Sequence, residues 1–375
     1  MVKLGDVCTV ISGSTPKTST SEYWDGDIKW ITPAELNEDS FYLYDSQRHI
    51  TELGKEKTGL SYMPAGTVIL SSRAPIGKTA IAGCEMCCNQ GFKNLICSDV
   101  IFNEYLYYFL KGKTAYLNSL GRGATFKEIS KSIVENIEIN LPALEDQKQI
   151  ARQFREVYRL ISLRKQQLTK LDELVKTRFV ELFGDPVTSE NKKKLSEIGR
   201  VFTGNTPSMK EPSYYESNDI PFIKPSDLNE NGVASIDDVE AFVSEKARPV
   251  ARIIPPNAVL VTCIGTIGKI GITTRESCCN QQINFIVPND GINSLYLTHC
   301  LTFFKSTLQN IANAPVVPII NKTQFSELEI PVFEVDKQHQ FAAFVKQTDK
   351  SKLAIQQSLD KLETLKKSLM QKYFG

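Results

Sequence analysis

The chain has 375 residues, of which 41% are apolar, and its 44 Lys and Arg residues nearly balance 43 Asp and Glu residues. This length and apolar fraction suit two or three globular domains and exclude a disordered protein. The first residues hold no apolar segment typical of a signal peptide, and no apolar run approaches the roughly 18 residues of a membrane helix. We therefore expect a cytoplasmic protein whose nine cysteines are reduced thiols.

The sequence consists of two copies of one unit, related by an offset of 191 residues. Short motifs of the first copy return in the same order in the second copy, and both copies end in Phe-Gly. Such self-similarity predicts that the two halves share one fold. The matching segments are 10–16 with 201–207, 27–33 with 219–225, 76–78 with 267–269 and 87–90 with 278–281.

The first part of each copy, 1–144 and 185–335, is rich in Gly, Pro and short β-branched runs. Runs bounded by Pro and Gly, such as 66–70 and 258–262, are predicted strands. Longer apolar-periodic segments, at 103–111 and 294–305, are predicted helices. Each of these parts is therefore predicted to be a mixed α/β or α+β domain built on a twisted sheet.

The second part of each copy, 145–184 and 336–375, contains no proline and carries apolar residues at alternating spacings of three and four. This spacing predicts two long helices, each about 60 Å in length, with one apolar face. Neither helix can bury that face alone, so we expect them to pack as an antiparallel coiled coil that also carries the subunit contacts. The predicted contact residues are Val157, Ile161, Leu168, Leu171, Val175, Ile355, Leu359, Leu362 and Leu369.

Charge follows the same division of the chain. The net charge is −2 for 1–144 and −4 for 185–335, but +3 for 145–184 and +4 for 336–375. Basic helices are often simply solvated, and they can equally meet acidic partner helices or a phosphate backbone. The sequence leaves both interpretations open.

These motifs, in this order and in duplicate, closely resemble the specificity subunit of type I restriction–modification enzymes. The resemblance covers essentially the whole chain and depends on the following segments: Gly13-Ser14-Thr15-Pro16, 30–36, Ile76-Gly77-Lys78, 136–142, 147–150 and 182–186. It implies target recognition domains at 1–144 and 185–335, followed by spacer helices at 145–184 and 336–375.

The resemblance also implies a function. Such a subunit has no catalytic residues and holds two adenine-N6 methyltransferase subunits on a bipartite, asymmetric sequence of double-stranded DNA. Two restriction–translocation subunits complete the complex, and S-adenosylmethionine, ATP and magnesium belong to the partners. The spacer helices would act as a ruler that fixes the number of unread base pairs between the half-sites. Because the recognition domains are slightly acidic, we expect weak DNA binding by the isolated chain.

The repeat separates two kinds of expected DNA contact. Residues alike in both copies should serve architecture or contact the DNA backbone, because those roles do not depend on base sequence. They are Gly13, Thr15, Lys78 and Gln90, with Gly204, Thr206, Lys269 and Gln281. Residues that differ at corresponding loops should read bases. They are Ser14, Lys17, Arg73, Lys93, Arg122 and Lys127, with Asn205, Ser208, Lys210, Thr266, Gln282 and Asn284.

Two other functions remain as alternatives. One is a coiled-coil scaffold for partner proteins that reads no DNA. The other is an NTPase, because 72–79 is one residue short of a phosphate-binding loop, with Ser72 in place of the first glycine. We expect no metal site, because the cysteines around 84–88 lack a second Cys or His pair at ligand spacing.

Overall fold

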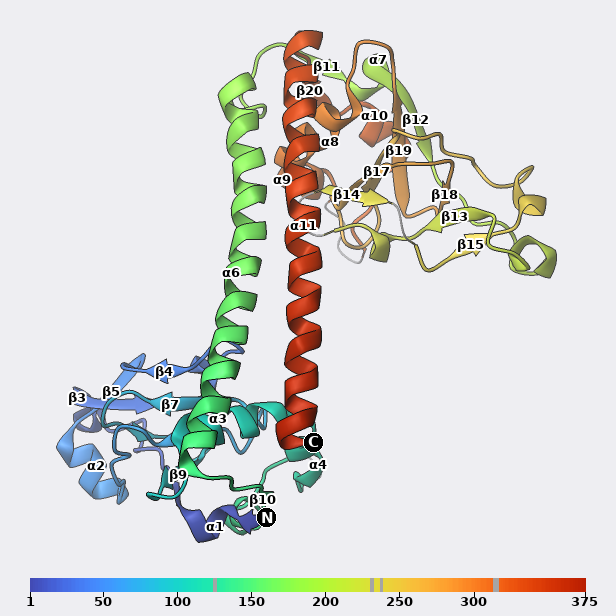
Figure 1. Ribbon diagram of the computed structural model, residues 1–375. Helices are drawn as coiled ribbons and strands as arrows, with labels where there is room; N and C mark the ends of the chain where they lie inside the picture. The colour runs from blue at the N-terminus through green and yellow to red at the C-terminus, as the bar shows by residue number, and fades with distance from the viewer. Residues whose placement is uncertain (124–126, 230–232, 237–238, 313–316) are drawn as a thin grey trace. The chain divides into compact units, whose positions relative to one another are not determined.

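The computed structural model describes residues 1–123, 127–229, 233–236, 239–312 and 317–375. They form two compact units. Unit 1 contains Met1–Leu163 and Ser358–Gly375, whereas unit 2 contains Arg164–Gln357. Figure 1 shows that each unit combines one globular domain with segments of two long helices. The chain thus leaves unit 1, builds unit 2, and returns to unit 1 at its C-terminal end.

The domain of unit 1 is built on a five-stranded sheet with the order β2-β9-β6-β7-β4. The pairs are antiparallel except for β4 with β7. A second sheet has the order β5-β3-β8, and a third pairs β1 with β10. The strands are β1 Val2–Lys3, β2 Cys8–Ser12, β3 Trp24–Ile31, β4 Tyr42–Leu43, β5 Arg48–Ile50, β6 Val68–Leu70, β7 Thr79–Ala82, β8 Cys87–Cys88, β9 Lys93–Cys97 and β10 Glu138–Ile139.

Apolar side chains cover both faces of this sheet. Every residue of β6 and β7 is buried, which suits their β-branched and small residues. Val68 and Leu70 point into a cluster that includes α3, whereas Ile69 lies in a separate cluster with Met63 and Phe92. The helices of the domain are α1 Leu4–Val7, η1 Ser21–Tyr23, η2 Pro33–Glu35, α2 Glu52–Thr58, α3 Asn103–Gly112, α4 Thr114–Leu120 and α5 Lys131–Glu135.

Unit 2 repeats this architecture. Its sheets have the orders β12-β19-β16-β17-β14, β15-β13-β18 and β11-β20, which correspond strand for strand to those of unit 1. The strands are β11 Lys192–Lys194, β12 Gly199–Thr203, β13 Ile220–Ile223, β14 Val233–Ile236, β15 Phe242–Val243, β16 Val259–Thr262, β17 Ile270–Thr273, β18 Cys278–Cys279, β19 Ile283–Pro288 and β20 Glu329–Pro331. The helices are α7 Leu195–Ile198, η3 Pro212–Tyr215, η4 Pro225–Asp227, η5 Glu245–Ala247, α8 Ser294–Phe303, α9 Lys305–Ile311 and α10 Lys322–Ser326.

The predicted repeat and the predicted mixed helix-and-sheet domains are confirmed by this correspondence. The two long helices are α6 Leu144–Phe183 and α11 Val335–Phe374. In unit 1 the Tyr373 hydroxyl donates to Gln153 Oε1 at 3.1 Å. In unit 2 Lys352 Nζ lies 2.6 Å from Asp172 Oδ1. Lys366 lies over the Tyr158 ring in unit 1, and Phe341 contacts Phe179 in unit 2. In both units a later residue of α6 thus meets an earlier residue of α11, so the segments run antiparallel, as predicted.

Each long helix ends inside the core of a domain. The Phe374 ring at the end of α11 stacks on Phe154 at a centroid distance of 5.5 Å and contacts Tyr105 at 5.2 Å. The Phe183 ring at the end of α6 contacts Tyr296 at 5.0 Å within unit 2. The Phe-Gly endings of the two copies thus perform the same packing role. No helix in the described part of the chain is long and apolar enough to cross a membrane.

Candidate nucleic-acid interface

Loops from distant parts of the sequence meet at the ends of the strands in unit 1. We call residues 12–16, 71–78, 88–93, 122–123 and 127–129 loop cluster 1. The Ser14 N–H donates to the Cys88 carbonyl at 3.1 Å, and the Ser72 N–H donates to the Gly91 carbonyl at 2.7 Å. The Ile129 N–H donates back to the Ser72 carbonyl at 3.0 Å. Backbone hydrogen bonds therefore hold these loops together.

The same arrangement recurs in unit 2. Residues 203–207, 262–269, 279–284 and 317–320 form loop cluster 2. The Cys263 N–H donates to the Gln282 carbonyl at 2.8 Å, and the Ile320 N–H donates to the Cys263 carbonyl at 2.8 Å. These bonds join the same loop pairs as the bonds of Ser72 and Ile129 in unit 1. The chain thus presents two loop clusters on matching backbone frames with different side chains.

Gly13 and Gly204 have an architectural role in these clusters. A Cβ on Gly13 would lie 2.2 Å from the carbonyl oxygens of Cys88 and Asn89. A Cβ on Gly204 would lie 2.2 Å from the Asn280 carbonyl oxygen. Any side chain at either position would push the loop off the turn that supports it. The close approach of two backbones, rather than a ligand, accounts for glycine in both copies.

A threonine–glutamine pair recurs in both clusters. The Thr15 hydroxyl donates to Gln90 Oε1, and the Thr206 hydroxyl donates to Gln281 Oε1 at 2.8 Å. Both glutamines are exposed. Because each amide oxygen accepts a hydrogen bond from threonine, the amide nitrogen is left to donate a hydrogen bond to a ligand. Such a fixed donor suits a phosphate oxygen, which carries no sequence information.

Lys78 is half-buried, and its expected phosphate contact stays a prediction. Its ammonium group donates to the carbonyl oxygens of Pro33 at 3.1 Å and Leu36 at 2.5 Å. Lys78 therefore ties the β6–β7 loop to η2, and the NTPase alternative would require this lysine to give up these two contacts. Lys269 is half-buried at the corresponding position of unit 2.

Three of the expected base-reading residues form an ion pair or hydrogen bonds within their own domains. Lys93 is 8% exposed, and its ammonium lies 3.2 Å from Glu128 Oε1. Asn284, at the corresponding position, is 1% exposed and binds the Thr203 hydroxyl and the Ile320 carbonyl. Both polar groups of the Asn205 side chain bind the backbone, at Val250 and Arg252. The sequence showed polar residues at these positions, but not that Lys93 and Asn284 are buried or that the backbone holds Asn205.

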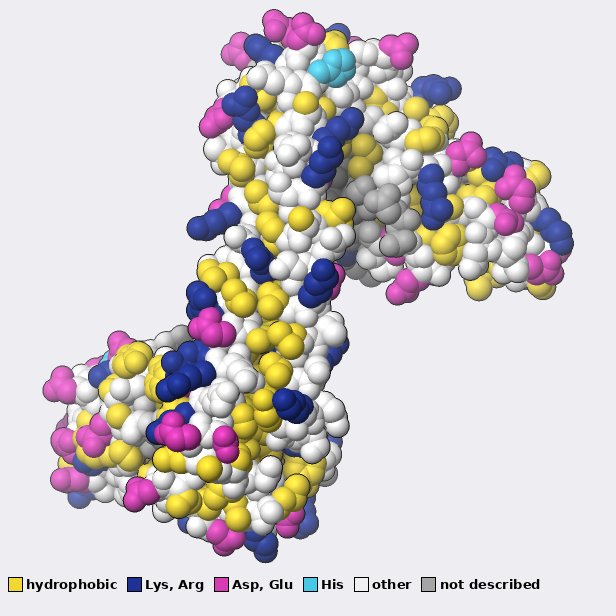
Figure 2. All heavy atoms as spheres, viewed as in Figure 1, with side chains coloured by type: hydrophobic (Ala, Val, Ile, Leu, Met, Phe, Trp, Pro, Cys, Tyr) yellow, Lys and Arg dark blue, Asp and Glu magenta, His cyan; other side chains and the backbone are white. Residues whose placement is uncertain are grey.

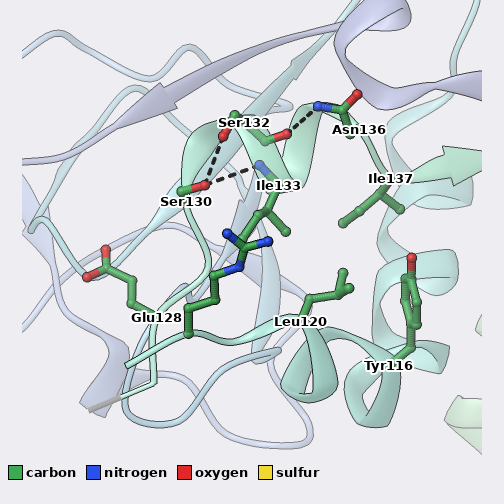
Figure 3. Close-up of a pocket in the computed structure, with 9 residues that line it drawn as sticks. Tyr116, Leu120, Glu128, Ser130, Ser132, Ile133, Asn136 and Ile137 are labelled. Atoms are coloured by element: carbon green, nitrogen blue, oxygen red, sulfur yellow. Dashed lines mark hydrogen bonds between the residues drawn. The ribbon is translucent and has the colours of Figure 1, made fainter. Parts of the chain in front are cut away.

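The remaining base-reading candidates keep accessible side chains. Arg73, Ser14 and Gln282 are half-buried. The exposed candidates are Lys17, Arg122, Lys127, Ser208, Lys210 and Thr266. Arg122 and Glu128 line a pocket of about 510 Å³ beside loop cluster 1. In Figure 3 the hydroxyls of Ser130 and Ser132 face each other on one side of this pocket, and Tyr116 and Leu120 lie on the other.

Two functional candidates were missed at the level of sequence. Glu128 bridges Arg73 and Lys93 through both of its carboxylate oxygens. Arg252 is exposed, and its guanidinium donates to the Thr203 carbonyl beside loop cluster 2. The other copy has a residue of different chemistry at each of these two positions. Comparison of the copies therefore could not indicate a role for either residue.

The long helices divide their apolar residues between core and surface. Of the predicted contact residues, Val157, Ile161, Val175 and Leu359 are buried by the chain itself and serve internal packing. The contacts with partner subunits stay a prediction. The half-buried ones are Leu168, Leu171, Ile355, Leu362 and Leu369. Other leucines on α6 and α11 are exposed, namely Leu144, Leu163, Leu174, Leu353 and Leu365. Figure 2 shows apolar and basic side chains interspersed along these helices.

The cysteines do not form an evident reactive site. Cys87, Cys88, Cys278 and Cys279 are buried. Burial raises the pKa of the Cys87 thiol to about 11 and that of Cys278 to about 12, which disfavours the thiolate. Within the residues that the structure describes, no group of three or more His, Cys, Asp and Glu side chains could hold a metal ion.

Solved structures place the fold in a known class. The chain is similar to the S subunit of the type I restriction–modification system from M. genitalium, with a TM-score of 0.64 and 14% identity over 100% of this chain and 95% of that one. A chain from a structural study of type I R-M complex assembly and conformational transition gives a TM-score of 0.59, with 18% identity over 100% and 96% of the two chains. The fold is therefore that of restriction–modification specificity subunits.

Sequence comparison gives the family. The model of the type I restriction modification DNA specificity domain matches residues 1–173 and 186–366. The chain belongs to this family and contains two such domains, which confirms the resemblance noted in its motifs.

Two relatives come from Methanocaldococcus jannaschii. The MjaIX specificity subunit is 37% identical over 243 residues, which are 59% of this chain and 56% of that relative. The match therefore spans just over half the length of this relative. The MjaVIII specificity subunit is 25% identical over an alignment that covers 99% of this chain and 90% of the relative.

Proposed function

We propose that this chain is the non-catalytic, sequence-specific DNA-recognition subunit of a type I restriction–modification complex. Each domain reads one half-site of a bipartite, asymmetric target through its loop cluster. The observation that carries this proposal is the duplicated threonine–glutamine pair, Thr15–Gln90 and Thr206–Gln281, surrounded by side chains that differ between the copies. Constant donors suit the DNA backbone, and variable neighbours suit different bases.

The helices supply the surface for partner subunits in this proposal. Leu353 is 61% exposed on α11, and Leu174 is 48% exposed on α6. Aliphatic side chains exposed to this degree on regular helices favour burial by other helices. We assign this surface to two methyltransferase subunits, with two restriction–translocation subunits joining the complex. The basic charge of the helices favours partners with acidic faces.

The proposal also divides the chemistry among the subunits. S-adenosylmethionine would bind the methyltransferase subunits, and ATP and magnesium would bind the restriction–translocation subunits. The complex would act in the cytoplasm, where the DNA is. Since the recognition domains are slightly acidic, the methyltransferase subunits would supply much of the cationic surface that holds the phosphates.

Co-expression with its methyltransferase partner tests the function. The host should lack adenine methylation, and single-molecule sequencing should map N6-methyladenine across its genome. We expect one bipartite motif with one modified adenine on each strand. A stable co-purified complex that produces no new methylation would contradict the proposal and favour a protein-binding scaffold.

A further inference from the structure

One backbone bridge carries charged side chains in loop cluster 1 and aliphatic side chains in loop cluster 2. In unit 1 an isolated β-bridge pairs Arg73 with Glu128. In unit 2 the corresponding bridge pairs Ile264 with Ile319. The backbone is thus held in the same way, while an ion pair in one domain is replaced by two aliphatic side chains in the other. A difference confined to side chains on matching frames is what two different DNA half-sites would require.

In loop cluster 1, Glu128 holds Arg73 at the surface. Arg73 Nη1 lies 3.6 Å from Glu128 Oε2, and Lys93 Nζ lies 3.2 Å from Glu128 Oε1. The Lys93 side chain is only 10% exposed, whereas those of Glu128 and Arg73 are each 37% exposed. The nearly buried lysine therefore anchors the carboxylate, and the carboxylate limits the freedom of the arginine. A guanidinium has five N–H donors, so one contact with Glu128 leaves a pair of donors for a ligand.

In loop cluster 2, a neutral side chain replaces Lys93, and aliphatic side chains replace Arg73 and Glu128. Asn284 replaces the anchoring lysine, and its hydrogen bonds to Thr203 Oγ1 and to the Ile320 carbonyl satisfy it internally. In the same loop cluster, Ile264 is half-buried, Ile319 is 46% exposed and Val317 is 44% exposed. We call Ile264, Val317 and Ile319 the aliphatic patch. Covering these branched side chains with an apolar group of a ligand would be favourable.

We propose that Arg73 reads a guanine in one half-site, and that the aliphatic patch reads the methyl group of a thymine in the other. This inference rests on the proposed DNA-reading function. Guanine offers N7 and O6 to an arginine in the major groove, and thymine is the base that offers a methyl group there. Glu128 is a positioning residue, because it acts on the DNA only through Arg73.

The test uses the assembled methyltransferase complex and synthetic duplexes. The motif is first mapped on ordinary DNA, and failure at this stage would count against the proposed function itself. Each guanine of the motif is then replaced in turn by 7-deazaguanine, and each thymine by deoxyuridine, which lacks the methyl group. We expect a fall of about ten-fold or more in methylation at one guanine. We expect a fall of about four-fold at one thymine in the other half-site.

Two variants connect each effect to its residue, and the untouched half-site serves as the folding control. In Arg73→Gln, 7-deazaguanine should cost nothing further at that position, while thymine readout stays unchanged. In Ile319→Ser, deoxyuridine and thymine should become equivalent, while guanine readout stays unchanged. Glu128→Gln should weaken the guanine preference without abolishing it. A mapped motif with insensitivity to both base analogues, or a guanine effect that survives Arg73→Gln, would overturn the inference.

Discussion

At the scale of single residues, the threonine hydroxyl of each loop cluster has a specific predicted effect. Thr15→Val keeps the side-chain shape but releases the amide of Gln90. Since a hydrogen bond of this kind contributes about 1 kcal/mol, we expect roughly five-fold weaker DNA binding by the assembled complex. The recognised motif should not change, because a phosphate contact carries no sequence information. Fluorescence anisotropy on cognate and unrelated duplexes measures both quantities.

Matched variants make this prediction specific. Thr206→Val should weaken binding to a similar extent, because Thr206 has the same role in unit 2. Thr9→Val changes an exposed threonine on β2 outside loop cluster 1, and it should leave binding unaltered. Equal affinities for Thr15→Val and the unmodified chain would show that the pair does not orient a DNA contact.

His299, a half-buried histidine on α8, is predicted to make the stability of unit 2 depend on pH. The His299 ring packs edge-on against Phe341 at 5.4 Å, and burial together with the positive charge of Lys352 lowers the pKa of His299 to about 3. The unfolded chain therefore binds more protons than the folded chain as pH falls below about 6.5. We expect the free energy of unfolding to decline over that acidic range and His299→Gln to reduce the slope.

Urea unfolding at pH 7 and pH 5 checks this, provided that the probe reports on unit 2. Thiol labelling of the buried Cys278 and Cys279, quantified peptide by peptide in a mass spectrometer, would serve, because it separates them from the cysteines of unit 1. The matched control is His339→Gln, which changes an exposed histidine on α11. A slope that His339→Gln reduces as much as His299→Gln would contradict the assignment.

The residue scale is also where sequence reasoning reached its limit. Comparison of the copies found the glycines and the Thr15–Gln90 pair, because their roles are shared. It cannot distinguish an exposed polar side chain from one turned inward, as the buried Lys93 and Asn284 show. The direction of a side chain depends on partners such as Glu128, which lie far away in the sequence.

At the scale of elements, the end of α11 is predicted to stabilise a domain that begins at the other end of the chain. Phe374 is 7% exposed and contacts Tyr105, Phe109 and Phe154. Replacement of a buried phenylalanine by alanine costs about 3–5 kcal/mol. Phe374→Ala should therefore destabilise unit 1, although the whole of unit 2 lies between residue 374 and the domain in the sequence.

Tryptophan fluorescence isolates this effect. The chain has two tryptophans, Trp24 and Trp30, and both are buried in the domain of unit 1. Phe374→Ala should shift the urea midpoint of their fluorescence to a lower concentration. Phe183→Ala removes the equivalent ring from unit 2 and should change that signal much less. If the two variants shifted the tryptophan transition equally, the helix end would not belong to the core of unit 1.

Elements were more predictable than individual contacts, because periodicity is local. The spacing of apolar residues identified both long helices, and turn residues identified the buried strands around 66–70 and 258–262. The return of Phe374 to the first domain was not predicted. The periodicity of a helix does not show which domain its last turn packs against. That contact depends on aromatic rings that are far apart in the sequence.

At the scale of the whole molecule, the exposed leucines of the long helices predict how the complex assembles. Leu353 is the clearest case, with 61% of its surface exposed. If a methyltransferase subunit covers it, Leu353→Glu would place a charge in an apolar interface and weaken assembly by about ten-fold or more. Circular dichroism should show unchanged helix content, because glutamate is a good helix former.

Ala354→Glu provides the matched control, because it adds the same charge to the next exposed position of α11. Co-purification of tagged variants with the methyltransferase subunit, quantified by subunit ratio, compares the two. Loss for Leu353→Glu alone would identify the apolar face of α11 as the docking surface. Equal loss for both variants would instead point to the basic charge of the helices as the main attraction. An unchanged subunit ratio for Leu353→Glu would show that the partner binds elsewhere.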